Sequence, residues 1–207
     1  MSDLNKEKYL SREEINKMKS FLYDRMMLSK MKGRIRGGIK PYYIIMFILY
    51  SGLRVSEVCK IKYKDLNLTS RTPSIQVING KGGKDRIVYV PSELKRLTAE
   101  YIQWKANVNE TSGDDEYVFI TECNNPFSPR SVQFMMEEVR DALKFKCKCS
   151  PHSLRHSFAL YLYEKTKDLR LVQKQLGHTN IQTTTIYADV TPERISAEVE
   201  DMWAEKV

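Results

Sequence analysis

The sequence predicts an α+β fold that is mainly α-helical and contains one small antiparallel β-sheet, built around a hairpin. Apolar residues recur at helical spacing through most of the chain, whereas residues 74–90 change to strand-like alternation on either side of a glycine-rich turn. A chain of 207 residues without internal repeats or a linker is expected to form one domain. We therefore expect a single domain over 1–207, with an N-terminal tail at 1–9 and a C-terminal tail helix at 191–207.

The N-terminal part predicts two helices joined by a loop. Ser11 and Glu14 have the spacing of a capping box, which marks the start of a helix. The apolar face of that helix consists of Ile15, Met18, Phe21 and Leu22. Residues 30–40 are glycine-rich and strongly basic, so we predict a loop that either contacts phosphate or is a solvated connection. Pro41 is expected to begin a buried helix that Gly52 ends.

The middle and the end of the chain continue this pattern. At the hairpin, Ile75 and Val77 alternate before the tip, and the apolar residues of the second strand follow it. We expect a polar loop over 109–116 and a short strand over 117–121. Further helices are predicted over residues 55–63, 91–107, 129–145, 151–166, 168–176 and 180–187, and a last one begins at Pro192.

The charge of the chain favours a polyanionic partner. Its formal net charge is +8 and its pI is about 9.2, from 34 Lys and Arg against 26 Asp and Glu. Nucleic acid is the first candidate and an anionic membrane the second, while a basic protein without such a partner has a similar composition.

Neither a membrane span nor a secretion signal is evident. The longest apolar run, residues 42–50, is much shorter than the ~20 residues that cross a bilayer. The N-terminus is polar, and the four cysteines are too scattered to predict a disulfide scaffold. We therefore expect a cytoplasmic protein with no membrane partner.

Arg54 is the first candidate for anion binding. It lies between the glycine that ends one predicted helix and the start of the next, and Glu57 follows at helical spacing. A guanidinium there can point inward and offer five donors to phosphate oxygens, held in place by the glutamate. The same spacing also fits an ordinary surface pair that contributes little to stability.

The hairpin tip, residues 79–84, carries Lys81 and Lys84 among three glycines. It lacks the sequence of a nucleotide-binding P-loop, and it connects two strands rather than a strand and a helix. A cationic finger that reaches toward DNA is one interpretation, and a plain basic turn is the other.

The last third of the chain holds all three histidines, His152, His156 and His178, together with Arg155 and Tyr187. These groups can bind an anionic phosphate and attack it. On a helix, His152 and Arg155 share a face, and His152 and His156 have a spacing that also suits a metal pair.

A zinc site with the two upstream cysteines, Cys147 and Cys149, is the alternative, but the spacing matches no usual structural zinc pattern. His156 is expected to be a core or helix-packing residue.

Taken together, these residues resemble the tyrosine recombinase (phage integrase, Xer and Cre-like) family. Five motifs occur in the family's order over roughly residues 10–205. They are Gly52-Leu53-Arg54-Val55-Ser56-Glu57, the hairpin Gly80-Lys81-Gly82, His152-x-Leu154-Arg155-His156-x-Phe158, Leu176-Gly177-His178 and Thr183-Thr184-x-x-Tyr187. The resemblance implies the tyrosine recombinase catalytic-domain fold for the single domain.

The resemblance also implies a mechanism for cleaving and rejoining DNA. Tyr187 would be the nucleophile and would form a 3′-phosphotyrosyl intermediate. Arg54 and Arg155 would bind the nonbridging oxygens of the scissile phosphate, and His178 would donate a further hydrogen bond. Glu57 would support the reaction by orienting Arg54.

Two further residues would handle protons in this scheme. His152 would accept the proton of the tyrosine, whose ordinary pKa is about 10, or hold it while the attack develops. Lys81 would protonate the departing 5′-oxygen, with Lys84 as the local competitor. The resemblance implies no metal, no ATP and no other cofactor, because the phosphotyrosine conserves the free energy of the phosphodiester.

The partner implied by the resemblance is double-stranded DNA, bound by a homo-oligomer that forms a synaptic tetramer. The last helix carries an apolar stripe of Ile195, Val199, Met202 and Trp203, which we expect to dock on a neighbouring protomer; packing onto its own domain is the alternative. Family members usually carry a separate N-terminal DNA-binding domain, whereas the residues before Arg54 are expected to form the first helices of the catalytic domain. We therefore expect either a recombinase that consists of the catalytic domain alone or a fragment of a longer one. The alternatives are a type IB topoisomerase-like nicking and sealing enzyme and a non-catalytic DNA-binding regulator on the same scaffold.

Overall fold

The computed structural model describes residues 9–32, 37–78, 85–110, 113–146, 149–177 and 191–203. The helices are α1 (Arg12–Met31), α2 (Ile39–Ser51), α3 (Val55–Val58), α4 (Ser92–Asn107), α5 (Pro129–Leu143), α6 (Pro151–Thr166), α7 (Leu169–Leu176) and α8 (Pro192–Trp203). A short 3-10 helix, Tyr63–Asp65, precedes three strands, β1 (Leu66–Asn67), β2 (Ser74–Val77) and β3 (Arg86–Tyr89). The predicted class, mainly helical with a small antiparallel sheet, is confirmed.

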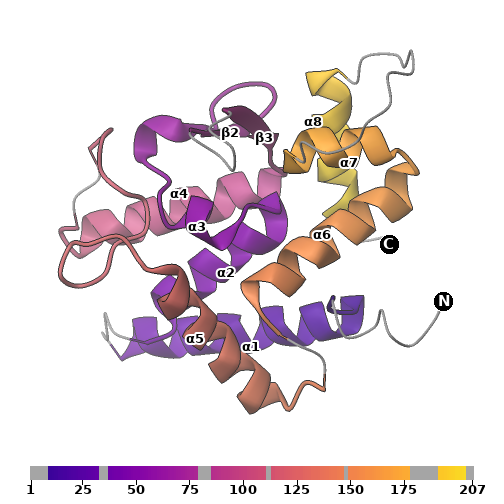
Figure 1. Ribbon diagram of the computed structural model, residues 1–207. Helices are drawn as coiled ribbons and strands as arrows, with labels where there is room; N and C mark the ends of the chain where they lie inside the picture. Colours follow the sequence, from indigo (N-terminus) through magenta and orange to yellow (C-terminus); the bar gives the residue numbers. More distant parts are fainter. Residues whose placement is uncertain are drawn as a thin grey trace.

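Helix α2 is the centre of the fold. All of its residues except Pro41 are buried, as expected for a helix that is apolar on every side. It contacts α1, α4, α5 and α6, and Figure 1 shows it crossing the middle of the molecule between them. The predicted end at Gly52 is confirmed, because that residue adopts a left-handed conformation with φ of 66°.

The sheet is antiparallel with the strand order β1-β2-β3. The predicted hairpin is confirmed, and its register pairs Ile75 with Val88 and Val77 with Arg86. Strand β1, which pairs Leu66 with Ile75, was not predicted. The tip at 79–84 lies outside the described residues. Figure 1 shows the sheet at one end of the molecule, beside α7 and α8, and both helices contact β3.

Several predicted boundaries were wrong. The helix expected over 55–63 stops at Val58, because the chain turns there and Lys62 forms an isolated bridge with Tyr117. The strand expected over 117–121 is absent from the described residues, where that segment forms isolated bridges only. The loop expected over 30–40 is shorter than predicted. Its last residues, Ile39 and Lys40, belong to α2 and are buried.

The other helix predictions agree closely with the structure. The helix over 151–166 has the predicted bounds, and the helix predicted over 91–107 begins one residue later, at Ser92. The helices predicted over 129–145 and 168–176 differ from α5 and α7 only at their ends. The helix predicted over 180–187 lies outside the described residues. None of the helices in the described part of the chain is both long and apolar enough to cross a membrane.

The apolar stripe of α8 is not exposed, in contrast to the expectation. Ile195, Val199 and Met202 are buried against the same domain, where α8 contacts α6 and β3. Trp203 packs edge-on against Tyr50 of α2, with ring centroids 5.0 Å apart. The stripe therefore completes the core of its own chain in this structure.

Candidate active site

Arg54 lies in the turn between α2 and α3, where the chain reverses direction after Gly52. Glu57 accepts a hydrogen bond from the backbone N–H of Arg54 at 2.8 Å, so it acts as the N-terminal capping group of α3. The other oxygen of Glu57 accepts a hydrogen bond from Nη1 of Arg54 at 2.7 Å. Glu57 therefore contacts both the backbone and the guanidinium of Arg54. The Glu57 side chain is 8% exposed and that of Arg54 is 24% exposed, so this is not the ordinary surface pair.

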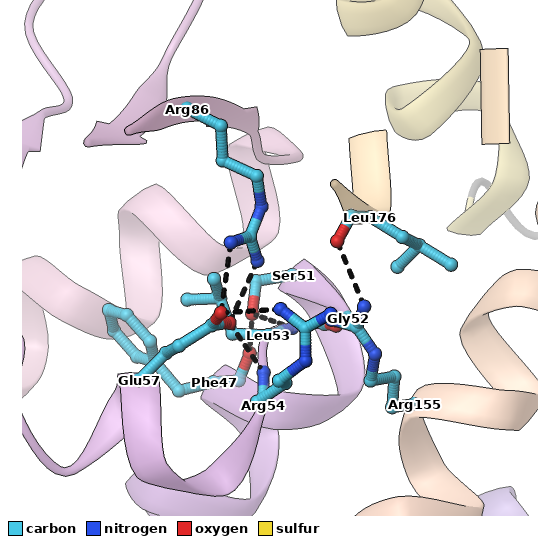
Figure 2. A network of polar contacts seen from close by, with 9 residues as sticks. All are labelled: Phe47, Ser51, Gly52, Leu53, Arg54, Glu57, Arg86, Arg155 and Leu176. Atoms are coloured by element: carbon cyan, nitrogen blue, oxygen red, sulfur yellow. Dashed lines mark hydrogen bonds and ion pairs between the residues drawn. The ribbon is translucent and has the colours of Figure 1, made fainter. Parts of the chain in front are cut away.

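Arg86, the first residue of β3, completes this network, and Figure 2 shows its side chain extending from the strand down to the carboxylate of Glu57. Its Nη1 donates to Oε1 of Glu57 at 2.9 Å and its Nη2 donates to Oε2 at 2.7 Å. Burial alone would raise the pKa of Glu57, but the hydrogen bonds and charges of Arg86 and Arg54 outweigh burial and lower that pKa to about 2. Glu57 is therefore a fixed anion at neutral pH.

Arg86 was missed in the sequence. The signal that could have identified it is strand alternation, since Arg86 and Val88 share one face of β3 while Ile87 is exposed. A charged residue on the inward face of a strand requires a buried partner. The position of that partner, Glu57 on a distant helix, is a tertiary contact that the local pattern does not contain.

Arg155 connects two helix ends. From α6, its Nη1 donates to the carbonyl of Gly52 at 2.5 Å and its Nη2 donates to the carbonyl of Leu176 at 2.9 Å (Figure 2). These carbonyls stand at the C-termini of α2 and α7, where unpaired acceptors and the helix dipole both favour a cation. Burial and then repulsion from Arg54 lower the pKa of Arg155 to about 10, so it stays charged at neutral pH.

Gly52 allows the turn before Arg54 to approach α6 and α7 closely. A Cβ at Gly52 would lie 2.5 Å from Cδ1 of Phe158 and 2.9 Å from Cδ2 of Leu176, which is too close for any side chain. The turn that precedes Arg54 therefore packs directly on α6 and α7. Gly177, which ends α7 with φ of 69°, is the residue before His178 in the sequence.

The side chain of Gln175 holds α7 against β3. Its Nε2 donates to the carbonyl of Tyr89 at 2.7 Å, and its Oε1 accepts from the backbone N–H of Tyr89 at 3.1 Å. These two hydrogen bonds satisfy the backbone of Tyr89 in the way that an additional strand beside β3 would. The second strand of the hairpin and α7 are thereby fastened to each other.

His152 lies in the first turn of α6, but its environment differs from the prediction. Arg155 is buried whereas His152 is exposed, so the two do not share an environment. The expectation that His156 belongs to the core was wrong. It is exposed, and its Nε2 lies 2.8 Å from Nε2 of His152, because the spacing of four residues places both rings on the outer face of α6.

Four candidate residues, Lys81, Lys84, His178 and Tyr187, lie outside the described residues. Cys147 of the alternative zinc site lies outside them as well, and Cys149 is buried. Within the described segments, no group of three or more histidine, cysteine or acidic side chains is arranged to hold a metal ion. The described part of the site therefore consists of Arg54, Glu57, Arg86 and Arg155, with His152 nearby in sequence on α6.

Curated relatives share extensive sequence with this chain. It is 34% identical over 191 residues to the tyrosine recombinase XerC of Halalkalibacterium halodurans, covering 87% of this chain and 61% of that protein. It is 35% identical over 193 residues to the tyrosine recombinase XerA of Thermococcus onnurineus, covering 91% of this chain and 60% of that protein. The chain thus spans about three fifths of the length of these two relatives.

Solved structures of other recombinases have a fold similar to that of this chain. A crystal structure of XerA recombinase matches with a TM-score of 0.67 and 27% identity, over 95% of this chain and 65% of that chain. The pre-cleavage complex of XerH site-specific recombinase with its difH substrate matches with a TM-score of 0.68 and 26% identity, over 84% of this chain and 47% of that chain. The model of the phage integrase family matches residues 9–194. The chain therefore belongs to the phage integrase family of tyrosine recombinases.

Proposed function

We propose that this chain acts as the catalytic domain of a site-specific DNA recombinase, which cleaves and rejoins DNA through a 3′-phosphotyrosyl intermediate. The observation that carries the proposal is the convergence of Arg54 and Arg155 from distant parts of the chain: the guanidinium of Arg155 binds the carbonyl of Gly52, two residues before Arg54, and lies close enough to be repelled by the charge of Arg54. Fixed donors of this kind stabilise charge on a phosphate in the transition state, each by about 10²–10³ in rate.

In the proposed reaction, the hydroxyl oxygen of Tyr187 attacks the phosphorus of the scissile phosphate, and the bond from phosphorus to the 5′-oxygen breaks. His152 accepts the proton of the tyrosine, and Lys81 gives a proton to the departing 5′-oxygen. Arg54, Arg155 and a hydrogen bond from His178 neutralise the charge that develops on the nonbridging oxygens. The reverse attack by a new 5′-hydroxyl rejoins the strand, so the cycle needs neither a metal nor ATP.

The geometry of Arg54 supports its part in this scheme. Its side chain is partly exposed and contacts Glu57 through Nη1, while Nε and Nη2 have no hydrogen-bond partner among the described residues. A guanidinium that is anchored along one edge can present its other edge to phosphate oxygens, which is the bidentate arrangement that arginine favours.

Among the candidate activities, we propose exchange of strands between two DNA sites. The relatives at 33–36% identity are named as tyrosine recombinases, which supports recombination over a type IB topoisomerase-like activity or a non-catalytic regulator. We propose double-stranded DNA as the partner, since XerH is a site-specific recombinase solved with its difH substrate and this chain carries a net charge of +8. We also propose a cytoplasmic location, which the free thiols Cys59 and Cys123 support.

We propose a synaptic tetramer in which α8 is exchanged between protomers. Because Ile195, Val199 and Met202 pack within their own domain, exchange would replace these contacts with the same contacts from a neighbouring copy. Light scattering on DNA with paired sites tests this proposal. Tetramers that disappear when Trp203→Ala weakens the packing of α8 are expected, and tetramers that persist unchanged would contradict it.

The proposed chemistry is tested with a nicked suicide substrate, from which the cleaved strand end diffuses away and leaves the protein trapped on DNA. Wild type is expected to form a covalent adduct that denaturing gels resolve, and Tyr187→Phe is expected to form none. Absence of an adduct from wild type on DNA that it binds would contradict an enzymatic function. Adducts accompanied by supercoil relaxation alone, without recombinant products from paired sites, would favour the topoisomerase alternative.

A further inference from the structure

Arg86 is bound to Glu57 more completely than Arg54 is. It contacts both carboxylate oxygens, at 2.9 and 2.7 Å, in the parallel arrangement that makes arginine–carboxylate pairs strong. Arg54 contacts the carboxylate with a single side-chain nitrogen, and its backbone N–H makes the other bond. Glu57 therefore takes four donors, and half of them come from Arg86.

Because Arg54 and Arg86 share Glu57, the carboxylate cancels less of the positive charge that Arg54 presents to a phosphate. A carboxylate that pairs with Arg54 alone would align the guanidinium but also cancel most of its charge. With Arg86 present, the single negative charge of Glu57 is balanced by Arg86, and the charge of Arg54 remains uncompensated. The side chains of Glu57 and Arg86 are 8% and 12% exposed, so solvent screens this balance only weakly.

The position of Arg86 connects three parts of the site. It begins β3, so only Asp85 separates it from the hairpin tip that carries Lys81 and Lys84. Its side chain also lies over Gly177, where an added Cβ would be 2.7 Å from Nε of Arg86. One side chain therefore touches the segment before His178 and the glutamate that orients Arg54.

We propose that Arg86 is a positioning residue for DNA cleavage, which holds and neutralises Glu57 so that Glu57 can align Arg54 without cancelling its charge. This inference rests on the proposed function, because it concerns the rate at which the site cleaves a phosphodiester. Arg86 acts through Glu57 and contacts no reacting atom. Its effect on cleavage therefore depends on the negative charge of Glu57.

That dependence separates the proposal from a purely structural role. Glu57→Gln removes the negative charge and keeps the shape, so Arg86 has nothing left to neutralise. In the wild-type background, Arg86→Met is expected to slow single-turnover cleavage at saturating protein by about 10- to 100-fold. In the Glu57→Gln background, the same change is expected to alter the rate by less than about twofold.

The experiment is a double-mutant cycle on the nicked suicide substrate, with rates expressed per folded molecule and DNA affinity measured separately. Arg96→Met is the matched control, since Arg96 also pairs with two glutamates, Glu93 and Glu100, but on the exposed surface of α4. It is expected to cleave as wild type does. If Arg86→Met does not fold, Arg86→Lys replaces it, because lysine keeps the charge and loses the bidentate contact.

Two results would overturn the proposal. One is a wild-type cleavage rate for Arg86→Met. The other is an equal slowing by Arg86→Met in both backgrounds, which would mean that Arg86 acts independently of Glu57. The proposed function fails by a different observation, namely the absence of any adduct from wild type, so the two failures are distinguishable.

Discussion

Two groups of buried charges in this molecule have the same composition, a carboxylate between two cations, and differ in what surrounds them. In the first, guanidinium groups contact the carboxylate beside a partly exposed turn. In the second, lysines contact the carboxylate inside the core. The first group consists of Glu57 with Arg54 and Arg86, and the second consists of Glu110 with Lys40 and Lys105.

The lysine group is enclosed by backbone acceptors. Nζ of Lys40 lies 2.6 Å from Oε1 of Glu110 and donates to the carbonyl of Ile120 at 2.8 Å. Nζ of Lys105 lies 3.9 Å from the other carboxylate oxygen and donates to the carbonyl of Val118 at 3.2 Å. Burial lowers the pKa of Lys105, whose side chain is fully buried. These cations fasten the loop after α4 and cannot reach a ligand.

The comparison teaches that charge alone does not identify a functional site. Arg54 is 24% exposed, whereas the exposed fractions of the Lys40 and Lys105 side chains are 7% and 0%. What distinguishes the site is a cation that is held along one edge and accessible along the other. Substitutions in the Glu110 group should therefore affect stability alone, whereas substitutions around Glu57 should affect DNA cleavage.

The largest effect is expected for Arg155, which lies beside the first group and also caps two helix ends as a structural residue would. Arg155→Ala should slow cleavage by about 10²–10³-fold. It should also lower the free energy of unfolding by at least about 2 kcal/mol, because the carbonyls of Gly52 and Leu176 lose their donor. Suicide-substrate kinetics and urea unfolding measure the two effects. A loss of cleavage without a loss of stability would show that the capping contacts matter little.

Glu110→Gln tests the lysine group. It leaves two buried lysines without a counter-charge, so we expect the free energy of unfolding to fall by about 3 to 5 kcal/mol. Cleavage per folded molecule should equal that of wild type, because the Lys40 and Lys105 side chains are buried in the core. Urea unfolding and single-turnover cleavage on the same preparation check both statements. Slower cleavage by the folded fraction would contradict the division between the groups.

The acid stability of the protein tests the state of Glu57. Its pKa is lowered from 4.5 to about 2, so its ionised form stabilises the fold above pH 4.5 and that stabilisation is lost as the pH falls toward 2. The shift corresponds to about 3 kcal/mol at neutral pH. The difference in unfolding free energy between wild type and Glu57→Gln should therefore be constant down to about pH 4.5 and shrink below it. A difference that stays constant to about pH 3 would show that this carboxylate is not held by Arg86 and Arg54 as described.

The smallest effect concerns the salt dependence of DNA binding. Arg54→Ala should reduce the slope of log affinity against log salt by about one, because one phosphate contact is lost. Lys105→Met should leave that slope unchanged, since the lysine is fully buried. Fluorescence anisotropy over a salt series measures both slopes. Equal slopes for Arg54→Ala and wild type would indicate that Arg54 does not meet the DNA backbone.

Much of the fold was predictable because its local signals are strong. The capping box at Ser11, the buried run that became α2 and the alternation around the hairpin all specify local structure, and each was confirmed. The errors occurred where tertiary contacts override local preference. Lys40 reads as part of a basic loop, but Glu110 pairs with it inside the core and α2 extends to include it.

The site was predictable in part. The pairing of Arg54 with Glu57 follows from helical spacing, and the sequence motifs indicated which arginines belong together. Arg86 was missed because its partner is distant in the sequence. His156 was assigned to the core because its exposure depends on which face of α6 packs inward, and the small amphipathicity of that helix does not reveal it.

The most direct test of the account is the identity of the residue that becomes attached to DNA. After cleavage of the suicide substrate, trypsin releases the segment 175–194, in which Tyr187 is the single tyrosine. We predict that mass spectrometry finds the 3′-phosphate of the cleaved strand on Tyr187 in wild type, and no modified peptide in Tyr187→Phe. A modification at any other residue, or the absence of one in wild type bound to its DNA site, would contradict the account.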